Sequence, residues 1–119
     1  MMEFSMELPD EPGQLARVTE ALAVANINIL TICAIGRVAP NVALVTEHVP
    51  QTRAMLDELG IEYIASPLLN MVMPDEAGSL AKFSRRLSDA GVNINSIYIL
   101  TKFNDRGDAE LVFSVDDVD

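Results

Sequence analysis

The chain has 119 residues, enough for one ordinary domain or two very small ones, and half of them are hydrophobic, which favours a packed core over disorder. Eighteen Asp and Glu against eight Lys and Arg give a net charge of −10, and no basic stripe with interleaved aromatic residues is present, so we expect no nucleic-acid binding. No apolar run reaches membrane-spanning length, and the first residues lack the regions of a signal peptide. We therefore expect a cytoplasmic protein without membrane contact.

Cys33 and His48 are the one cysteine and the one histidine of the sequence. A single cysteine rules out an intramolecular disulfide, and together the two residues fall short of a metal site with the usual zinc-ligand spacing. Because Cys33 lies in the apolar run 29–35, we expect a buried, inert thiol rather than a nucleophile paired with His48. We expect His48 itself to be a solvated loop residue.

The most specific signal in the sequence is an internal repeat. A shift of 65 residues aligns Pro9–Ala16 with Pro74–Ala81, and eleven of the 24 positions from 9 to 32 are identical to their counterparts. Self-similarity at a fixed offset indicates two copies of one structural unit. The sequence therefore predicts two domains, residues 1–67 and residues 68–119.

Each copy is expected to begin with a strand, a turn and an amphipathic helix. In the first copy, the alternation of Phe4, Met6 and Leu8 predicts one buried face of a strand over Glu3–Leu8, and the turn residues 10–13 follow. A helix is expected over Gly13–Ala25. The residues predicted to form its inner face are Leu15, Val18, Leu22 and Ala25, with Leu80, Phe83, Leu87 and Ala90 as their counterparts in the second copy.

The rest of the first copy predicts two further strands, a second helix and a last strand. Pro50 suits a first helical turn and Gly60 a helix end, and Met55, Leu56 and Leu59 would form the inner face between them. The remaining elements expected are a β-rich run at Ile27–Gly36, a turn at 39–41, a strand at Val42–Thr46 and a strand at Ile61–Ala65. The order β-α-β-β-α-β predicts an α+β, ferredoxin-like unit, an antiparallel four-stranded sheet with two helices on one face.

The second copy is expected to be incomplete at its C-terminal end. Strands are predicted at 68–73, 92–103 and 108–115, with a turn at 104–107 that holds a two-residue insertion. The counterparts of the second helix and the fourth strand would then fall largely after Asp119. Either the chain continues, or its tail is absent by nature, or a partner completes the sheet, since an open strand edge is usually covered.

Both copies carry a motif of the form Asp-x-x-Gly-x-Leu, followed after the helix by Asn-Ile-Asn-Ile or Gly-Val-Asn-Ile. The first reads Asp10-Glu11-Pro12-Gly13-Gln14-Leu15 with Asn26-Ile27-Asn28-Ile29, and the second reads Asp75-Glu76-Ala77-Gly78-Ser79-Leu80 with Gly91-Val92-Asn93-Ile94. This pattern resembles the ACT domain family. Two copies in register make the chain similar to stand-alone tandem ACT proteins that bind amino acids.

The resemblance implies a regulatory module that binds a small effector, most often an amino acid, at a domain or subunit interface near the strand–helix turn. A homodimer and an amino-acid-metabolising enzyme are the partners it implies. The glycines permit a close backbone approach, and the helix N-terminus offers N–H groups to an α-carboxylate. The candidate ligand-binding residues are Asp10, Glu11, Pro12, Gly13, Gln14, Leu15 and Asn28, with Asp75, Glu76, Ala77, Gly78, Ser79, Leu80 and Asn93 in the second copy.

Each of these residues also has a purely structural interpretation. Asp10 and Asp75 would cap the helices. The two glycines would allow the turn and tight helix–sheet packing, and the two asparagines would fix the helix–strand loop through hydrogen bonds to the backbone.

Two functions remain open besides catalysis, which is the weakest. The first is ligand-responsive regulation, and the second is a ligand-free structural dimerisation module that assembles through exposed strand residues such as Ile97 and Ile99. No catalytic triad order, metal cluster, phosphate loop or dinucleotide fingerprint is present, so we expect no enzyme activity and no cofactor.

Overall fold

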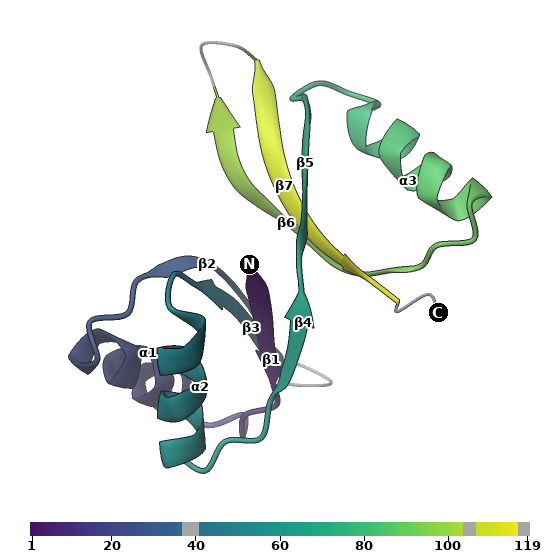
Figure 1. Ribbon diagram of the computed structural model, residues 1–119. Coiled ribbons are helices and arrows are strands. Elements are labelled where there is room, and N and C mark those ends of the chain that lie inside the picture. Colours follow the sequence, from purple (N-terminus) through teal and green to yellow (C-terminus); the bar gives the residue numbers. More distant parts are fainter. Residues whose placement is uncertain (37–40, 104–106, 117–119) are drawn as a thin grey trace. The chain divides into compact units, whose positions relative to one another are not determined.

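The chain forms two compact units, Met1–Pro67 and Leu68–Asp119, in a computed structural model that describes residues 1–36, 41–103 and 107–116 (Figure 1). The expected turn at 39–41 and most of the turn at 104–107 lie outside the described residues. They are called unit 1 and unit 2, in chain order.

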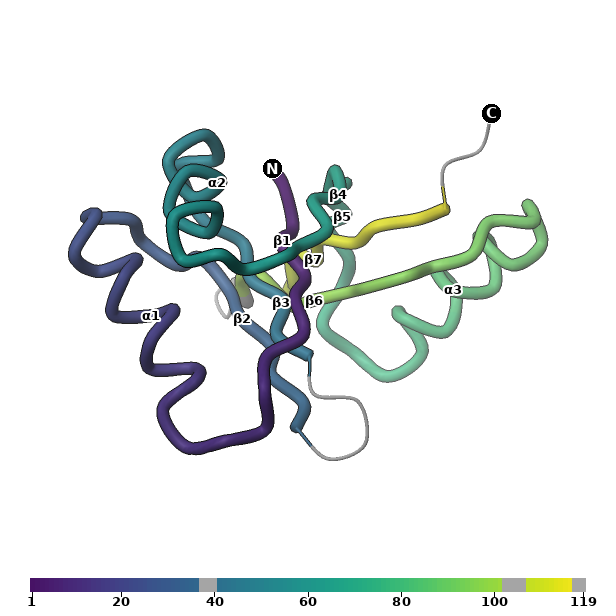
Figure 2. Tube along the Cα trace, turned by 90° about the horizontal axis from the view of Figure 1, so that it is seen from below, coloured from purple at the N-terminus to yellow at the C-terminus, as the bar shows by residue number. Residues whose placement is uncertain are grey.

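Unit 1 has the predicted order of elements, β-α-β-β-α-β. Its two helices lie on the same side of the strands (Figure 2). The elements are β1 (Met2–Met6), α1 (Gln14–Val24), β2 (Ile29–Ile35), β3 (Asn41–Thr46), α2 (Val49–Glu58) and β4 (Ile64–Pro67).

The four strands of unit 1 form an antiparallel sheet in the order β2-β3-β1-β4. Phe4 of β1 is opposite Leu44 of β3 on one side and opposite Ala65 of β4 on the other. The ferredoxin-like prediction is therefore confirmed. The last strand was predicted too early, at 61–65, because Ile61 is a buried core residue of the α2–β4 connection rather than part of the strand.

The core of unit 1 lies between the sheet and its two helices. Phe4, Met6 and Leu8 are buried as predicted, and Val18 and Leu22 cover them from α1. The rest of the predicted α1 face is wrong, because Leu15, at the first turn, and Ala25, at the C-cap, are exposed. From α2, Met55 and Leu56 are buried, and Leu59 is half-buried against the same core.

Unit 2 repeats the first four elements of unit 1. Its three strands form an antiparallel sheet in the order β5-β7-β6, which corresponds to β1-β3-β2. The described residues of unit 2 include no counterpart of α2 or β4. Its elements are β5 (Leu69–Pro74), α3 (Ser79–Asp89), β6 (Ile94–Phe103) and β7 (Asp108–Val115).

The offset between the repeats is larger after the β6–β7 hairpin than the sequence predicted. The Glu47 N–H donates to the Asn28 carbonyl, and in unit 2 the Asp116 N–H donates to the Asn93 carbonyl. The asparagines are 65 residues apart and the acidic residues 69 apart, so the insertion is four residues rather than two. It lengthens β6 to 10 residues against 7 in β2, with an additional register shift between Ile99 and Thr101.

The core of unit 2 is smaller and more aromatic. Met73, Phe83, Ala109, Leu111 and Phe113 are its buried residues. The predicted exposed surface on β6 needs a correction, because Ile97 packs against this core. Ile99 is opposite Leu111 on the same side of the sheet and is 55% exposed.

Candidate functional site

The turn between β1 and α1 is built on a left-handed glycine. Gly13 is the N-cap of α1 with φ 90°, and no side chain donates or accepts a capping hydrogen bond there. Its carbonyl accepts from the Arg17 N–H at 3.0 Å, which starts the helical ladder. The capping interpretation of Asp10 is therefore wrong: Asp10 lies three residues before the cap and leaves the helix N-terminus to other partners.

The same geometry is repeated in unit 2. Gly78 is the N-cap of α3 with φ 93°, again without a side-chain cap, so Asp75 is not a cap either. A Cβ placed on Gly13 or Gly78 would meet nothing within 4 Å. The glycines are thus required by their backbone conformation and not by tight helix–sheet packing.

A hollow of about 150 Å³ lies beside the turn of unit 1. Asp10 and Glu11 line it from the turn, Gln14 and Leu15 from the first turn of α1, and the end of β2 at Gly36 closes another side. Asp10 lies close to β2, since a Cβ on Gly36 would be 3.4 Å from the Asp10 Oδ1. The predicted residues Asp10, Glu11, Gln14 and Leu15 therefore meet at one place, whereas Pro12 and Gly13 shape the turn without lining the hollow.

The N-terminus of α1, beside the hollow, offers polar backbone groups. The N–H groups of the first helical turn have no carbonyl partner within the helix. The Gln14 N–H makes a long contact of 3.4 Å with the carbonyl of Glu11, which lies before the helix. No acidic residue occupies that first turn. Such an N-terminus carries a partial positive charge that attracts anions.

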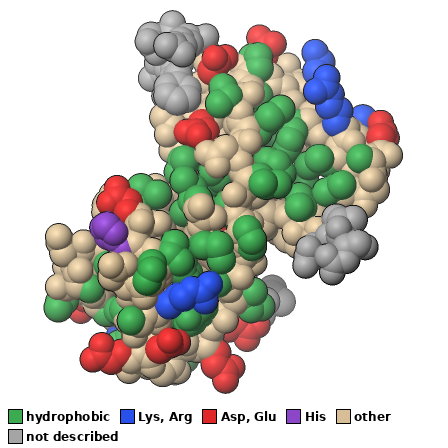
Figure 3. Space-filling model, in the orientation of Figure 1, with side chains coloured by type: hydrophobic (Ala, Val, Ile, Leu, Met, Phe, Trp, Pro, Cys, Tyr) green, Lys and Arg blue, Asp and Glu red, His purple; other side chains and the backbone are tan. Residues whose placement is uncertain are grey.

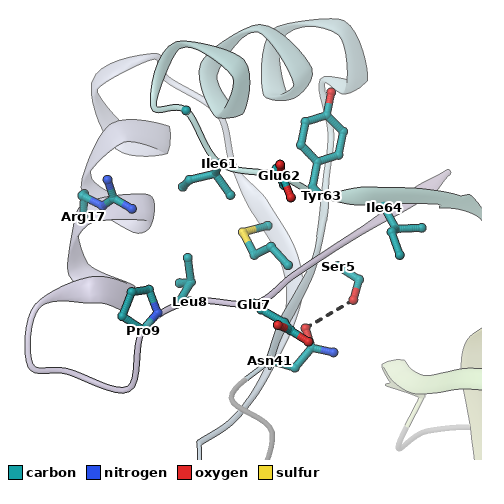
Figure 4. A pocket seen from close by; sticks show the side chains of 12 residues that line it. Ser5, Glu7, Leu8, Pro9, Arg17, Asn41, Ile61, Glu62, Tyr63 and Ile64 are labelled. Atoms are coloured by element: carbon teal, nitrogen blue, oxygen red, sulfur yellow. Dashed lines mark hydrogen bonds between the residues drawn. The ribbon is translucent and has the colours of Figure 1, made fainter.

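A larger groove of about 610 Å³ lies on the other side of the same turn and shares Leu8, Pro9 and Asn41 with the hollow. Arg17 of α1 borders it, together with Glu7 and Glu62 (Figure 4). Along its wall the Ser5 hydroxyl donates to the Asn41 Oδ1 at 3.3 Å. Sequence reasoning missed this groove, because its lining comes from four separate segments that no motif connects.

Asn28 does not lie at the turn of its own unit. It precedes β2, whereas Asp10 is next to Gly36 at the other end of that strand, and seven residues of strand span about 23 Å. Its Nδ2 donates to the Glu47 Oε1 at 3.4 Å, and its carbonyl accepts from the Glu47 N–H. These bonds tie the start of β2 to the end of β3, but the side-chain bond reaches a carboxylate and not the backbone of the helix–strand loop that the structural interpretation expected.

In unit 2 the matching residues form a turn whose side chains are mostly exposed. Asp75, Glu76, Ala77, Gly78 and Leu80 are exposed and Ser79 is half-buried. The Asp75 N–H donates to the Gly107 carbonyl at 2.6 Å, which ties the turn to the start of β7. Asn93 again lies at the far end, where its Nδ2 donates to the Asn95 Oδ1 at 3.2 Å.

Cys33 and His48 do not form a reactive pair. Cys33 is exposed, which corrects the expectation of a buried thiol, since its side chain is on the β2 face that alternates away from the core. His48 is exposed, as predicted, and is the N-cap residue of α2. Among the described residues, no group of three or more His, Cys, Asp or Glu is placed to hold a metal ion. No described helix is long and apolar enough to cross a membrane.

The sequence model of the ACT domain matches residues 68–119. No curated protein matches the chain. The match falls on unit 2, the shorter of the two repeats, and unit 1 carries the same motif in a complete βαββαβ unit.

Solved structures share the fold over nearly the whole chain. A protein from Bacteroides thetaiotaomicron is 23% identical, with a TM-score of 0.81 over 98% of this chain and 79% of its own. The alpha and beta subunits of an aspartokinase are 21% identical, with a TM-score of 0.70 over 95% of this chain and 81% of that one. The ligand-free regulatory subunit of aspartate kinase from Thermus thermophilus is 20% identical, with a TM-score of 0.68 over 95% and 82%.

Proposed function

We propose that this chain, whose residues 68–119 match the sequence model of the ACT domain, is a non-catalytic regulatory module that binds an amino acid at the β1–α1 turn. The observation that carries the proposal is the uncapped N-terminus of α1 beside the hollow at Asp10. One of the similar structures is described as the regulatory subunit of an aspartate kinase, which supports regulation over catalysis.

The two charged groups of an amino acid match the two sides of the turn. Its α-carboxylate would accept hydrogen bonds from the first-turn N–H groups of α1, at the positive end of the helix. Its ammonium group would donate to the Asp10 carboxylate, which lies at the opposite wall near Gly36. Leu15, 41% exposed, would provide apolar contact for the side chain of the ligand.

The hollow alone is too small for this task, so a second surface has to complete it. Its volume of about 150 Å³ is below the roughly 300 Å³ at which ordinary small-molecule pockets begin. A second copy of the chain is the partner we propose, since a ligand held between two copies would favour the dimer through contacts that the monomer lacks. The regulated partner would then be an amino-acid-metabolising enzyme that senses the change in assembly.

A thermal-shift screen of the purified chain against the twenty amino acids tests the proposal. A ligand at one hundred times its Kd should stabilise the folded state by about 2.7 kcal/mol. Sedimentation with and without that ligand should show a shift toward the dimer. If no amino acid raises the melting temperature at millimolar concentration, amino-acid sensing is excluded, and a dimer that persists without any response favours the ligand-free structural module instead.

Three variants locate the site once a ligand is found. Asp10→Ala should abolish the response, because the ammonium group loses its acceptor. Asn28→Ala is the matched control, since it also removes a polar side chain but at the opposite end of β2, and it should respond like the wild type. Loss of the response in Arg17→Gln with retention in Asp10→Ala would move the site to the larger groove and contradict the proposed location.

A further inference from the structure

The groove beside Arg17 opens where the pairing of β1 with β4 ends. The last pair is Ser5 with Ile64, and two residues further along the same register Glu7 would be opposite Glu62. Their side chains would lie on one face of the sheet, where like charges directly opposite each other disfavour pairing. The two chain segments separate at these carboxylates, and the groove of about 610 Å³ lies between them.

The walls of the groove offer backbone groups to a ligand. Among the described residues, the N–H and C=O groups of Glu7 and Glu62 make no backbone hydrogen bond. An extended peptide supplies such bonds when it pairs with an exposed strand segment. The floor is apolar, because the buried side chains of Met6, Leu8 and Ile61 line it. A ligand of this groove should therefore combine main-chain hydrogen-bonding groups with apolar surface.

Three exposed charged side chains border the groove. Arg17 lies at one end, on α1, whereas Glu7 and Glu62 come from the two walls toward the other end (Figure 4). In the part of the chain that the structure describes, Arg17 forms no ion pair with either carboxylate. One positive and two negative charges are thus held apart around the same space, and a ligand with separated charges of both signs would satisfy them.

These charges distinguish among classes of ligand. A free amino acid carries both of its charged groups on one carbon atom and would fill only part of the groove. A phosphate-bearing ligand would bring its negative charge between two carboxylates, and a wholly apolar ligand would leave three charges without partners. Acidic side chains also lie along the lower edge of unit 1, the side on which the chain passes from α2 to β4 (Figure 3). These surroundings favour a ligand with an excess of positive charge.

We propose that the groove binds a free, short, extended peptide with a basic N-terminal residue and a C-terminal carboxylate. The carboxylate would accept hydrogen bonds from the Arg17 guanidinium, and the ammonium group and the basic side chain would pair with Glu7 and Glu62. Main-chain groups between the two ends would bond to the backbone of the walls, and side chains would alternate between the apolar floor and solvent. This binding does not depend on an amino acid in the hollow at Asp10.

The tetrapeptide Lys-Ala-Ala-Ala, with both termini free, serves as the probe for the full chain. Isothermal titration calorimetry measures its Kd, and a titration followed by NMR locates its site. We expect the amide signals of Glu7, Leu8 and Glu62 to shift, while the signal of Gly36 at the hollow stays in place. Absence of binding, or binding that leaves the signals of Glu7 and Glu62 unchanged, would contradict a peptide site in this groove.

Changes at the two ends of the peptide test its orientation. Amidation of the C-terminus removes the carboxylate, and Arg17→Gln removes its partner, so each change alone should raise the Kd about fivefold. The two changes together should weaken binding no more than either alone, because they break the same contact. Acetylation of the N-terminus and Glu62→Gln should be coupled in the same way. Acetylation and Arg17→Gln act at opposite ends, so their effects on the Kd should multiply.

Arg53→Gln is the matched control for Arg17→Gln. Arg53 is also an exposed arginine of unit 1, but its guanidinium carbon lies 5.8 Å from the centre of the Phe4 ring and it does not line the groove. The variant removes the same charge from the chain and should bind the peptide like the wild type. Asp10→Ala should also retain peptide binding, which separates this groove from the amino-acid site proposed for the hollow.

Three further results would overturn the assignment. Equal weakening by Arg17→Gln and Arg53→Gln would show a general effect of charge rather than a contact. Loss of peptide binding in Asp10→Ala with retention in Arg17→Gln would place the peptide in the hollow. Binding that requires the free carboxylate but tolerates acetylation and a longer N-terminal extension would assign the groove to the C-terminal tail of a protein instead of a free peptide.

Discussion

Gly13 and Gly78 hold the same left-handed backbone conformation, with φ of 90° and 93°, at the N-caps of α1 and α3. No neighbouring atom lies within 4 Å of a Cβ built on either residue. A side chain would therefore have room but would force an L-residue into a region that costs about 1–2 kcal/mol. The repeat keeps glycine at both positions for this reason.

Gly13→Ala should lower the free energy of unfolding by about 1–2 kcal/mol in urea denaturation, and Gly78→Ala by a similar amount. Gly36→Ala is the control, because the φ of Gly36 lies outside the left-handed region and its new Cβ would make an ordinary contact at 3.4 Å with the Asp10 Oδ1. Equal losses in Gly13→Ala and Gly36→Ala would show that backbone strain is not the cause.

The buried hydroxyls of Thr46 and Thr52 should contribute unequally to stability. Their oxygens are 2.6 Å apart, and the Thr52 hydroxyl donates to the His48 carbonyl at 2.7 Å, so Thr46 must be the donor in the shared bond. Thr52→Val leaves the buried Thr46 hydroxyl without its acceptor and should cost about 1–3 kcal/mol. Thr46→Val leaves the bond to His48 intact and should cost less.

The double variant Thr46→Val/Thr52→Val separates this account from simple loss of packing. It removes both hydroxyls, so it should be more stable than the sum of the two single losses predicts, as a double-mutant cycle of urea midpoints would measure. Strict additivity of the two losses would contradict the hydrogen-bond assignment. The second repeat already carries a valine at the position of Thr46, since Val115 occupies it.

Much of the fold could be predicted because the repeat gives the first four elements of the unit twice. The alternation of Phe4, Met6 and Leu8 identified the buried face of β1, and the turn at Gly13 was recognisable from residue type alone. The inner face of α1 was predicted only in part, because Leu15 keeps helical spacing with Val18 but lies in the first turn of the helix and is exposed.

The candidate site was harder to predict than the fold, since motif residues that are close in sequence need not be close in space. Asp10 and Asn28 belong to one motif, yet β2 separates them by its full length. The groove beside Arg17 depends on the path of the α2–β4 connection, which no local pattern encodes. The register of β7 depends on a four-residue insertion whose length shows only in the strand pairing.

The core of unit 2 depends on one aromatic pair to a degree that unit 1 does not. The Phe83 ring meets the Phe113 ring edge-on, with centroids 4.9 Å apart and planes at 73°, and Phe83 is the one buried residue of α3. In unit 1, α1 buries two residues and α2 three, so no single side chain joins helix to sheet. The attachment of α3 should therefore fail with one substitution.

Phe83→Ala should cost about 3–5 kcal/mol, because it removes a buried ring and leaves a cavity beneath α3. Phe83→Leu keeps most of the volume and loses chiefly the edge-to-face contact, so its cost should be about 1 kcal/mol. Amide hydrogen exchange should locate the loss of stability. Protection should fall in β5, β6 and β7 but not in the strands around Phe4, because the two units bury separate clusters. If protection fell equally around Phe4, the two cores would not be energetically separate. If Phe83→Leu destabilised as much as Phe83→Ala, ring geometry rather than filled volume would hold α3 to its sheet.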